Sequence, residues 1–364
     1  MGSMLAVGLM SGTSLDGIDA ALIETDGEGS IRPIAFRSDP YSEQARDTIR
    51  AAAALALAFE RPRPNPEILA AEDMLTRRHI MVVRQLLVET GVAAKDIGAI
   101  GFHGQTIAHR PDRGWTWQIG DGAKMAEALG ITVVDDLRSA DVAAGGQGAP
   151  LLPVYHRALA EGLEKPVALL NLGGVGNISF IGGDETLIAF DTGPANALID
   201  DWMRAEAGRP YDEGGAFAAT GRVDEAVLAA MLDNPFFDQP PPKSLDRADF
   251  TLQPVRGLAP ADGATTLTAF TAITVSYGLR LLPERPRRLI VAGGGRHNGA
   301  LMRMISEACG LSAEPIEAVG WNGDATEAEG FAYMAVRALK GLPISFPGTT
   351  GAPEPMTGGR VNRP

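Results

Sequence analysis

One strand–turn–strand pattern occurs twice in the sequence, and it constrains the fold more than any other feature. The apolar segment 5–10 leads into a Gly/Ser/Thr/Asp turn, and the segment 18–23 resumes an apolar strand. In the same way, the apolar segment 167–172 leads into a glycine-rich turn, and the segment 178–181 returns. Two apolar strands joined by such a turn form a β-hairpin. Each half of the chain is therefore predicted to open with a hairpin, although the two halves share little sequence identity.

Further strands and helices alternate after each hairpin. Apolar residues at helical spacing predict a long helix that stops at Gly91, and Asp121 can cap a short helix that ends at Gly130. Strands are predicted over residues 97–102, 131–134, 187–190 and 288–292, and helices over residues 67–90, 121–130, 195–205 and 298–308. This mixture indicates an α/β fold of two similar lobes, whose strand-to-helix turns would face a common cleft.

The length of the chain supports two lobes. A single hydrophobic core stops growing at about 250–300 residues, and this chain has 364. A Gly/Pro-rich stretch at residues 145–150 lies near the middle. We predict an N-terminal lobe over residues 4–140 and a C-terminal lobe over residues 141–364, with the last helix and tail able to return to the first lobe.

Composition excludes several classes of partner. The formal net charge of −13 repels nucleic acid and anionic lipid. Cys309 is the single cysteine, so no disulfide forms within the chain. The start lacks a basic region, and the longest apolar run, residues 51–59, is too short to span a bilayer. We expect a cytoplasmic protein with neither nucleic acid nor a membrane as partner.

The turn at residues 12–17 is the first candidate site. Its glycines allow backbone N–H groups to crowd around an anion, and the hydroxyls of Thr13 and Ser14 can add donors. It contains no lysine and is not a Walker A loop, so phosphate charge would need a metal ion. Asp16 and Asp19 could hold Mg²⁺ through water. An ordinary hairpin turn with a solvated Asp is the alternative.

The triplet Asp191-Thr192-Gly193 is the second candidate site. A carboxylate at a strand end before a helix can act as a base, and the amides that follow can meet a phosphate. Aspartic proteases use the same triplet, but they need two such aspartates, and this chain has one. A helix-capping role for Asp191 remains the structural alternative.

Two more groups of residues complete the candidates. Gly293-Gly294-Gly295 stands between a predicted strand and a helix, an arrangement that suits either a nucleotide or a simple turn. The candidate sugar-binding side chains, whose structural roles also stay open, are His103, Gln105, Gln118 and Arg138. Of Glu327 and Glu329, which cannot share a helix face, one is expected to face the cleft and the other solvent.

These motifs, in this order along nearly the whole chain, resemble those of anhydro-N-acetylmuramic acid kinases. They are the segments 8–19, 103–106 (His-Gly-Gln-Thr), 118–120 (Gln-Ile-Gly), 136–138 (Asp-Leu-Arg) with Asp141, 145–151, 171–174 (Asn-Leu-Gly-Gly), 190–196, 241–244 (Pro-Pro-Lys-Ser), 293–295 and Glu327-Ala328. The chain departs from the family at Leu245-Asp246, where Thr-Gly is usual, and at Ala195, where Gly is common. Neither departure is expected to touch Asp191, but the first leaves the role of its loop open.

The resemblance implies two ribonuclease-H-like lobes of mixed sheet flanked by helices, with ATP, Mg²⁺ and a cell-wall sugar in the cleft. It also implies a homodimer that recycles peptidoglycan fragments. Asp191 would be the catalytic base, and His103, Gln105, Gln118, Arg138 and Glu327 would contact the sugar. The implied ATP-binding residues are Gly12, Thr13, Ser14, Leu15, Asp16, Gly17, Ile18, Asp19, Gly173, Gly174, Gly193, Gly293, Gly294 and Gly295.

The substrate sets a chemical requirement. In a 1,6-anhydro sugar O6 is bonded to C1 and carries no proton, so a base must activate water to attack C1 before O6 can take a phosphoryl group. Asp191 can serve both changes. An ordinary hydroxyl-phosphorylating sugar kinase and a non-enzymatic actin-like ATP-binding module are the competing hypotheses.

Overall fold

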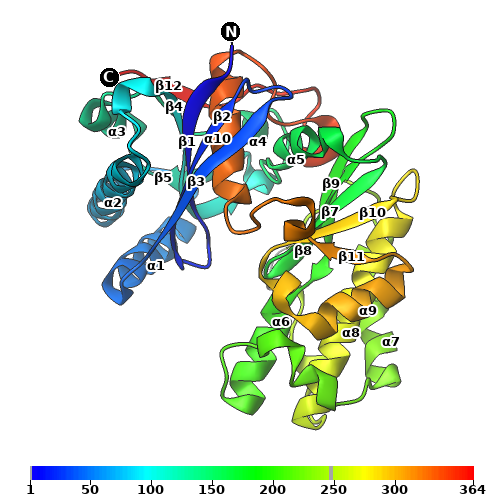
Figure 1. Ribbon diagram of the computed structural model, residues 1–364. Coiled ribbons are helices and arrows are strands. Elements are labelled where there is room, and N and C mark those ends of the chain that lie inside the picture. Colours follow the sequence, from blue (N-terminus) through cyan, green and yellow to red (C-terminus); the bar gives the residue numbers. More distant parts are fainter. Residues whose placement is uncertain (1, 246–248) are drawn as a thin grey trace. The chain divides into compact units, whose positions relative to one another are not determined.

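The computed structural model describes residues 2–245 and 249–364, and the chain divides into two compact units. The first unit comprises Met1–Glu161 together with Asp324–Pro364, and the second comprises Gly162–Gly323. The chain therefore leaves the first unit once and returns to it, so that the last helices and the tail pack with the N-terminal sequence (Figure 1).

The first unit is built on a seven-stranded mixed sheet (Figure 1). Its strands are β1 (Met4–Ser11), β2 (Gly17–Thr25), β3 (Ile31–Pro40), β4 (Ile97–Arg110), β5 (Trp115–Ile119), β6 (Val133–Asp135) and β12 (Arg360–Asn362). The order is β12-β6-β4-β1-β2-β3, and β5 pairs with β4. The strands β1, β2 and β3 form an antiparallel meander, whereas β4 runs parallel to β1 and β6 parallel to β4.

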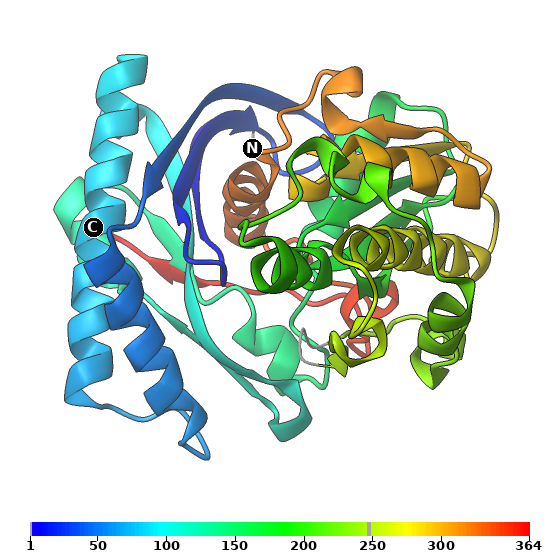
Figure 2. The same cartoon turned by 90° about the horizontal axis from the view of Figure 1, so that it is seen from below.

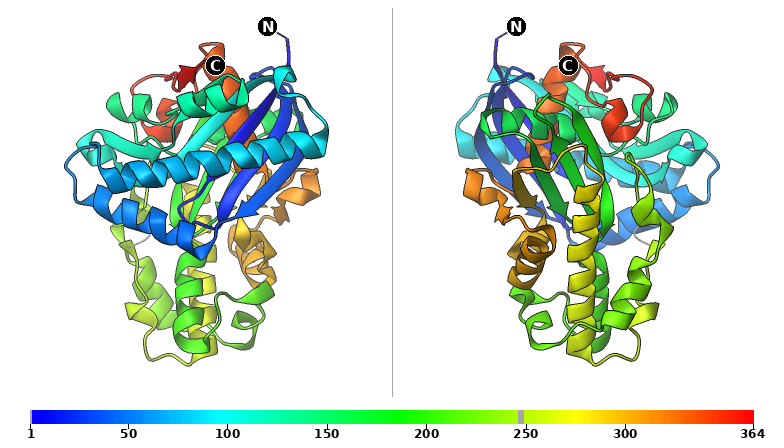
Figure 3. Two further views of the ribbon diagram at one scale, coloured as in Figure 1. Left: turned by 90° about the vertical axis from the view of Figure 1, so that its left-hand side faces the viewer. Right: turned by 90° about the vertical axis from the view of Figure 1, so that its right-hand side faces the viewer.

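Helices cover both faces of this sheet. They are α1 (Glu43–Leu57), α2 (Pro66–Thr90), α3 (Gly122–Leu129), α4 (Ser139–Ala143), α5 (Pro153–Leu159), α10 (Thr326–Leu339) and α11 (Pro347–Thr350). The helices α1 and α2 lie side by side on one face, and α10 lies on the other (Figures 2 and 3). Alternate residues of β1 serve the two layers, because Val7 and Leu9 pack in the core with α1 and α2 while Ala6 packs with α10.

The second unit repeats the arrangement with a five-stranded sheet of order β11-β10-β7-β8-β9. Its strands are β7 (Val167–Leu172), β8 (Val175–Ile181), β9 (Leu187–Pro194), β10 (Arg288–Ala292) and β11 (Ala313–Pro315). Its helices are α6 (Asn196–Trp202), α7 (Glu225–Leu232), α8 (Pro260–Arg280) and α9 (Gly299–Cys309). Again three antiparallel strands are followed by two that run parallel to the first. The core of this sheet lies against α8 and α9 (Figure 3).

The predicted α/β class with two mixed sheets flanked by helices is confirmed, and so are both hairpins. Gly91 and Gly130 end their helices in the left-handed conformation, and Asp121 caps α3 as expected. Several predicted boundaries were wrong. The strand predicted over residues 97–102 continues to Arg110, and the one predicted over residues 131–134 spans Val133–Asp135. The strand predicted over residues 187–190 continues to Pro194, because Gly193 and Pro194 still pair with β8. The helix predicted over residues 195–205 ends as α-helix at Trp202 and continues as a short π-helical turn.

No helix in the described parts of the chain combines the length and the apolar content that crossing a bilayer requires.

Two glycines bring α10 into direct contact with the sheet. A Cβ atom at Gly8 would lie 1.8 Å from the carbonyl oxygen of Ala328, and one at Gly101 would lie 1.9 Å from that of Phe331. Real Cβ atoms do not approach backbone this closely, so these positions tolerate only glycine. The absence of two methyl groups thus fixes how near α10 lies to β1 and β4.

We therefore expect Gly8→Ala to destabilise the protein by about 3 kcal/mol or more, because the methyl group must push α10 off the sheet. Urea unfolding followed by circular dichroism would measure the change. Gly162→Ala is the control, since a Cβ atom there meets no atom within 4 Å. Equal stability of the two variants would show that α10 can move away at little cost.

Candidate active site

The turn between β1 and β2 is held from behind by its carbonyl groups. The Gly12 carbonyl accepts hydrogen bonds from the Leu15 amide and from Gln105 Nε2, both at 3.2 Å. The Leu15 carbonyl accepts from Arg46 Nε at 3.1 Å, and the Asp16 carbonyl accepts from the Tyr41 amide at 3.0 Å. Three carbonyl groups of the turn are therefore satisfied by donors of the first unit.

Three amides of the turn, in contrast to these carbonyl groups, lack hydrogen-bond partners among the described residues. The N–H groups of Thr13, Ser14 and Asp16 donate to no acceptor within the described residues, and these three residues are exposed. Leu15, whose side chain is buried, adopts a left-handed conformation with φ 59°, which turns consecutive amides toward one side. Successive amides arranged in this way form an anion-binding concavity.

Gln105 lies behind this turn. It is buried, donates to the carbonyls of Gly12 and Thr106, and accepts a 2.5 Å hydrogen bond from Ser11 Oγ. Ser11 Oγ also pairs with the Tyr41 hydroxyl at 2.8 Å, and burial raises the pKa of Tyr41 to about 12. The nitrogen and the oxygen of the Gln105 side-chain amide are thus both hydrogen-bonded within the protein, and these contacts fix the position of the turn.

Acidic side chains gather beside the turn. Burial raises the pKa of Asp19; Ser38 opposes the rise through a hydrogen bond, while the charges of Asp324 and Asp16 add to it. Burial likewise raises the pKa of Glu327, with Arg138 opposing and Asp19 adding. Among the described residues no three His, Cys, Asp or Glu side chains form a direct metal cage. Asp16 and Asp19, the two residues predicted to hold Mg²⁺ through water, both belong to this group.

Arg138 is held by His103 at the end of β6. Arg138 Nε donates to His103 Nε2 at 2.9 Å, and its Nη1 donates to the Gly148 carbonyl at 2.7 Å. Because Nε2 accepts, His103 carries its proton on Nδ1, which donates to the Gly104 carbonyl. Burial lowers the pKa of His103 well below its usual value and that of Arg138 to about 10, so at neutral pH the pair is neutral imidazole and guanidinium cation.

Gln118 and Glu327 leave acceptor atoms unused. Gln118 Nε2 donates to the hydroxyls of Thr106 and Thr116 at 3.0 and 2.8 Å, but its Oε1 is buried and has no partner within the described residues. Glu327 is half-buried near Arg138. Glu329 was expected in solvent if Glu327 faced a ligand, and this was wrong: it is buried and accepts a 2.7 Å hydrogen bond from the Tyr155 hydroxyl.

In the second unit the glycine turns and Asp191 lie at one end of the sheet. Asp191 pairs across the sheet with Asn177, Asn177 pairs with Asn171, and Asn171 pairs with Ala292. The turn of Gly173 and Gly174 follows β7, the segment 293–295 follows β10, and Gly193 lies two residues beyond Asp191. The carboxyl ends of these strands therefore bring together Asp191 and the glycines that the sequence predicted separately.

Gly293 is required by close approach. It has φ 76°, and a Cβ atom there would lie 2.5 Å from Asn171 Oδ1 and 2.6 Å from the Leu172 carbonyl oxygen. A short 3₁₀ turn, Gly294–His297, then leads to Asn298, whose side chain caps α9. Close packing against the end of β7 therefore requires glycine at this position, and the next residue, Gly294, is exposed.

The loop of residues 241–245, whose role the sequence analysis left open, forms two hydrogen bonds with Asp191. The Asp191 amide donates to the Lys243 carbonyl at 2.9 Å, and its Oδ2 accepts from the Leu245 amide at 2.8 Å. Burial raises the pKa of Asp191 to about 6, and the Leu245 hydrogen bond moderates the rise. The triplet that begins at Asp191 lies at the end of β9, and α6 begins at Asn196, so the predicted position at a strand end before a helix is confirmed.

The expectation that neither family departure touches Asp191 was also wrong, because Leu245 bonds to it directly; Asp246 lies outside the described residues. Lys243 anchors the loop. Its buried ammonium donates to the carbonyls of Phe236 and Phe237 at 2.7 and 3.3 Å, and burial lowers its pKa. The Pro-Pro-Lys-Ser motif at residues 241–244 was the available signal for this contact, but no residue pattern identified its partner.

Comparison with known proteins supports the predicted family along the full chain. A sequence model of the family described as anhydro-N-acetylmuramic acid kinase matches residues 4–363. A protein of that name from Rhizorhabdus wittichii is 74% identical and covers 100% of both sequences. Another from Zymomonas mobilis is 56% identical over 99% of this chain and 100% of its own. Among solved structures, the Acidaminococcus fermentans (R)-2-hydroxyglutaryl-CoA dehydratase component A covers 92% of this chain and 98% of its own, with 10% identity and a TM-score of 0.48.

The full-length match makes this chain an ATP-dependent phosphotransferase. It belongs to the anhydro-N-acetylmuramic acid kinase family, as the sequence motifs predicted.

If Asp191 acts as a base, it must be ionised, so activity should fall as the pH drops through about 6. We expect kcat/KM to decline about tenfold for each pH unit below that value. A stopped assay of ADP formation between pH 4.5 and 8 would measure the profile. Activity that stays constant down to pH 4.5 would mean that Asp191 is not desolvated in the working enzyme.

Arg46 provides a second prediction, because it is a cation at the turn that sequence reasoning missed. If the turn holds the phosphates of ATP, Arg46→Gln should raise the KM for ATP about tenfold by loosening the Leu15 carbonyl. Arg50→Gln is a matched control: Arg50 lies one helical turn further on and shares the ion pair to Glu43, but it does not contact the turn. Equal effects of both substitutions would assign the change to the helix surface.

Proposed function

We propose that this protein hydrolytically opens 1,6-anhydro-N-acetylmuramic acid and phosphorylates its O6. The products are N-acetylmuramate 6-phosphate and ADP, and the reaction recycles peptidoglycan fragments in the cytoplasm. The observation that carries the proposal is the environment of Asp191, a clasped carboxylate whose pKa of about 6 suits a general base near neutral pH. Family membership supports the choice of substrate.

The chemistry needs one base for two linked bond changes. Asp191 takes a proton from water, and the resulting hydroxide attacks C1. The C1–O6 bond breaks, and its electron pair goes to O6, which attacks the γ-phosphorus of ATP. The bond between the γ-phosphorus and the bridging oxygen then breaks, and its electrons leave with ADP. Positioning and charge neutralisation supply the remaining rate enhancement.

Each unit contributes a different part of the binding machinery. The free amides of the turn at residues 12–17, with Ile18 and Asp19 at the start of β2, would hold the phosphates. Asp16 and Asp19 would hold Mg²⁺ through water, and the ion would supply positive charge against the phosphates. In the second unit, the adenosine would lie on the glycines at the ends of its strands, namely Gly173, Gly174, Gly193, Gly293, Gly294 and Gly295.

The sugar would be recognised by groups whose bonding capacity remains unused. Arg138 Nη2 has no partner among the described residues and would bind the carboxylate of the muramic acid. Gln118 Oε1 and the Glu327 carboxylate would accept hydrogen bonds from sugar hydroxyl or amide groups. His103 and Gln105 would act without contacting the sugar. His103 would orient Arg138, and Gln105 would hold the turn at residues 12–17. We also propose that the protein is a homodimer, as the family resemblance implies.

A coupled assay of ADP formation, with chromatography of the sugar, tests this function. ADP should form with 1,6-anhydro-N-acetylmuramate and ATP, and ring opening should occur at the same rate. Turnover of free N-acetylmuramate instead would favour an ordinary hydroxyl-phosphorylating kinase. ADP release that is independent of any sugar would favour an ATP-binding module.

We expect Asp191→Asn to reduce ring opening and ADP formation together by about 10²–10⁴-fold, because Asn cannot take the proton. Calorimetry should show nearly unchanged ATP affinity. Asp184→Asn is the control, since Asp184 is an exposed turn residue between β8 and β9. Ring opening without ATP consumption in Asp191→Asn would separate the two steps and assign coupling to another residue.

A further inference from the structure

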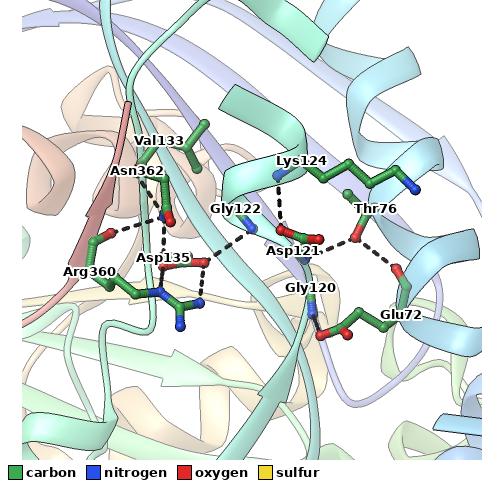
Figure 4. A network of polar contacts seen from close by, with 10 residues as sticks. All are labelled: Glu72, Thr76, Gly120, Asp121, Gly122, Lys124, Val133, Asp135, Arg360 and Asn362. Carbon is green, nitrogen blue, oxygen red and sulfur yellow. Dashed lines mark hydrogen bonds and ion pairs between the residues drawn. The ribbon is translucent and has the colours of Figure 1, made fainter. Parts of the chain in front are cut away.

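The last strand of the chain is tied to a buried carboxylate at the end of β6 (Figure 4). Arg360 donates to both oxygens of Asp135, from Nε at 3.0 Å and from Nη2 at 2.8 Å. Asn362 Nδ2 adds a bond to Oδ1 at 3.0 Å. Asp135 is buried whereas the Arg360 side chain is 63% exposed, so the arginine reaches inward from the surface to neutralise it.

The same carboxylate also holds α3. Asp135 Oδ2 accepts from the Gly122 amide at 3.2 Å (Figure 4). The residues just before it are fixed to α2, because the Gly120 amide donates to Glu72 Oε1 and the Asp121 amide donates to Thr76 Oγ1, both at 3.0 Å. These residues directly follow Gln118 and the end of β5. The side chain of Asp135 thus links the tail, β6 and the start of α3 through hydrogen bonds.

The tail also lies against the residues that follow Asp135. A Cβ atom at Gly358 would lie 2.9 Å from the Leu137 carbonyl oxygen, and one at Gly359 would lie 3.1 Å from Leu137 Cδ2. Between these contacts Asp136 adopts a left-handed conformation with φ 50°, which is costly for a non-glycine residue and needs support from its surroundings. The next residue is Arg138.

We infer that β12 is a positioning device for the sugar site, in which Arg360 acts through Asp135 to fix the backbone that carries Arg138. Arg360 itself touches no substrate. Without it, Asp135 keeps its burial but loses its bidentate cation, and such a carboxylate is stable only if the chain around it rearranges toward water. Arg138 bonds to His103 and Gly148 through defined atoms, so a shift of its backbone would misplace its free amino group.

The inference rests on the proposed role of Arg138, and Arg360→Leu tests it. Calorimetry of 1,6-anhydro-N-acetylmuramate without ATP should show binding weakened about tenfold, with a similar rise in the KM for the sugar. The KM for ATP should stay within about twofold, because no hydrogen bond among the described residues links the turn at residues 12–17 to Asp135. Arg363→Leu, in the same tail but exposed, should match the wild type.

Two milder variants keep the test decisive if Arg360→Leu does not fold. Arg360→Lys keeps the charge without the bidentate geometry, and Asn362→Ala removes one bond; both should weaken sugar binding less, in the same direction. An unchanged sugar affinity in all three variants, or equal rises of both KM values, would overturn the inference. Failure of the proposed function is distinguishable, because the wild-type protein itself would then neither bind nor phosphorylate the anhydro sugar.

Discussion

The contact between α10 and the two central strands of the first unit is the constraint on which this unit depends. Gly8 and Gly101 let the backbone of the helix lie directly on β1 and β4. This contact brings the start of α10 to the end of β1, where Asp324 and Glu327 join Asp19 near the phosphate-binding candidate. Any larger residue at either glycine would move these charges away from the turn. The positions of these carboxylates therefore depend on the absence of side chains at Gly8 and Gly101.

The two units use one topology for different chemistry. In both, three antiparallel strands precede two parallel ones, and functional candidates lie where strands end. In the first unit, backbone and side-chain donors satisfy the carbonyls of Gly12, Leu15 and Asp16, and three amides of the turn have no acceptor among the described residues. In the second, a loop anchored by Lys243 grips both the backbone and the carboxylate of Asp191. The fold thus supplies the location, and local hydrogen bonds decide what each location can do.

Much of the fold could be predicted from the sequence, because hairpins, helices and helix ends follow from patterns of neighbouring residues. Apolar segments joined by glycine-rich turns predicted the hairpins, apolar residues at helical spacing predicted α2, and glycines predicted the helix ends at Gly91 and Gly130. The motifs also identified the family. What the sequence could not give were contacts between distant segments. The Leu245 amide on Asp191, the Arg46 contact to Leu15 and the burial of Glu329 depend on packing, and no residue pattern near these positions encodes a partner 31 to 174 residues away.

The return of the chain to the first unit has a consequence for synthesis. The helix α10 and the strand β12 leave the ribosome only after the whole second unit has been made. At about 5–20 residues per second, this delay is on the order of ten seconds. During it, the face of β1 and β4 that α10 will cover has no intramolecular partner, while the continuous second unit can already fold. In a nascent chain, that face of the first sheet therefore stays uncovered until α10 has been synthesised.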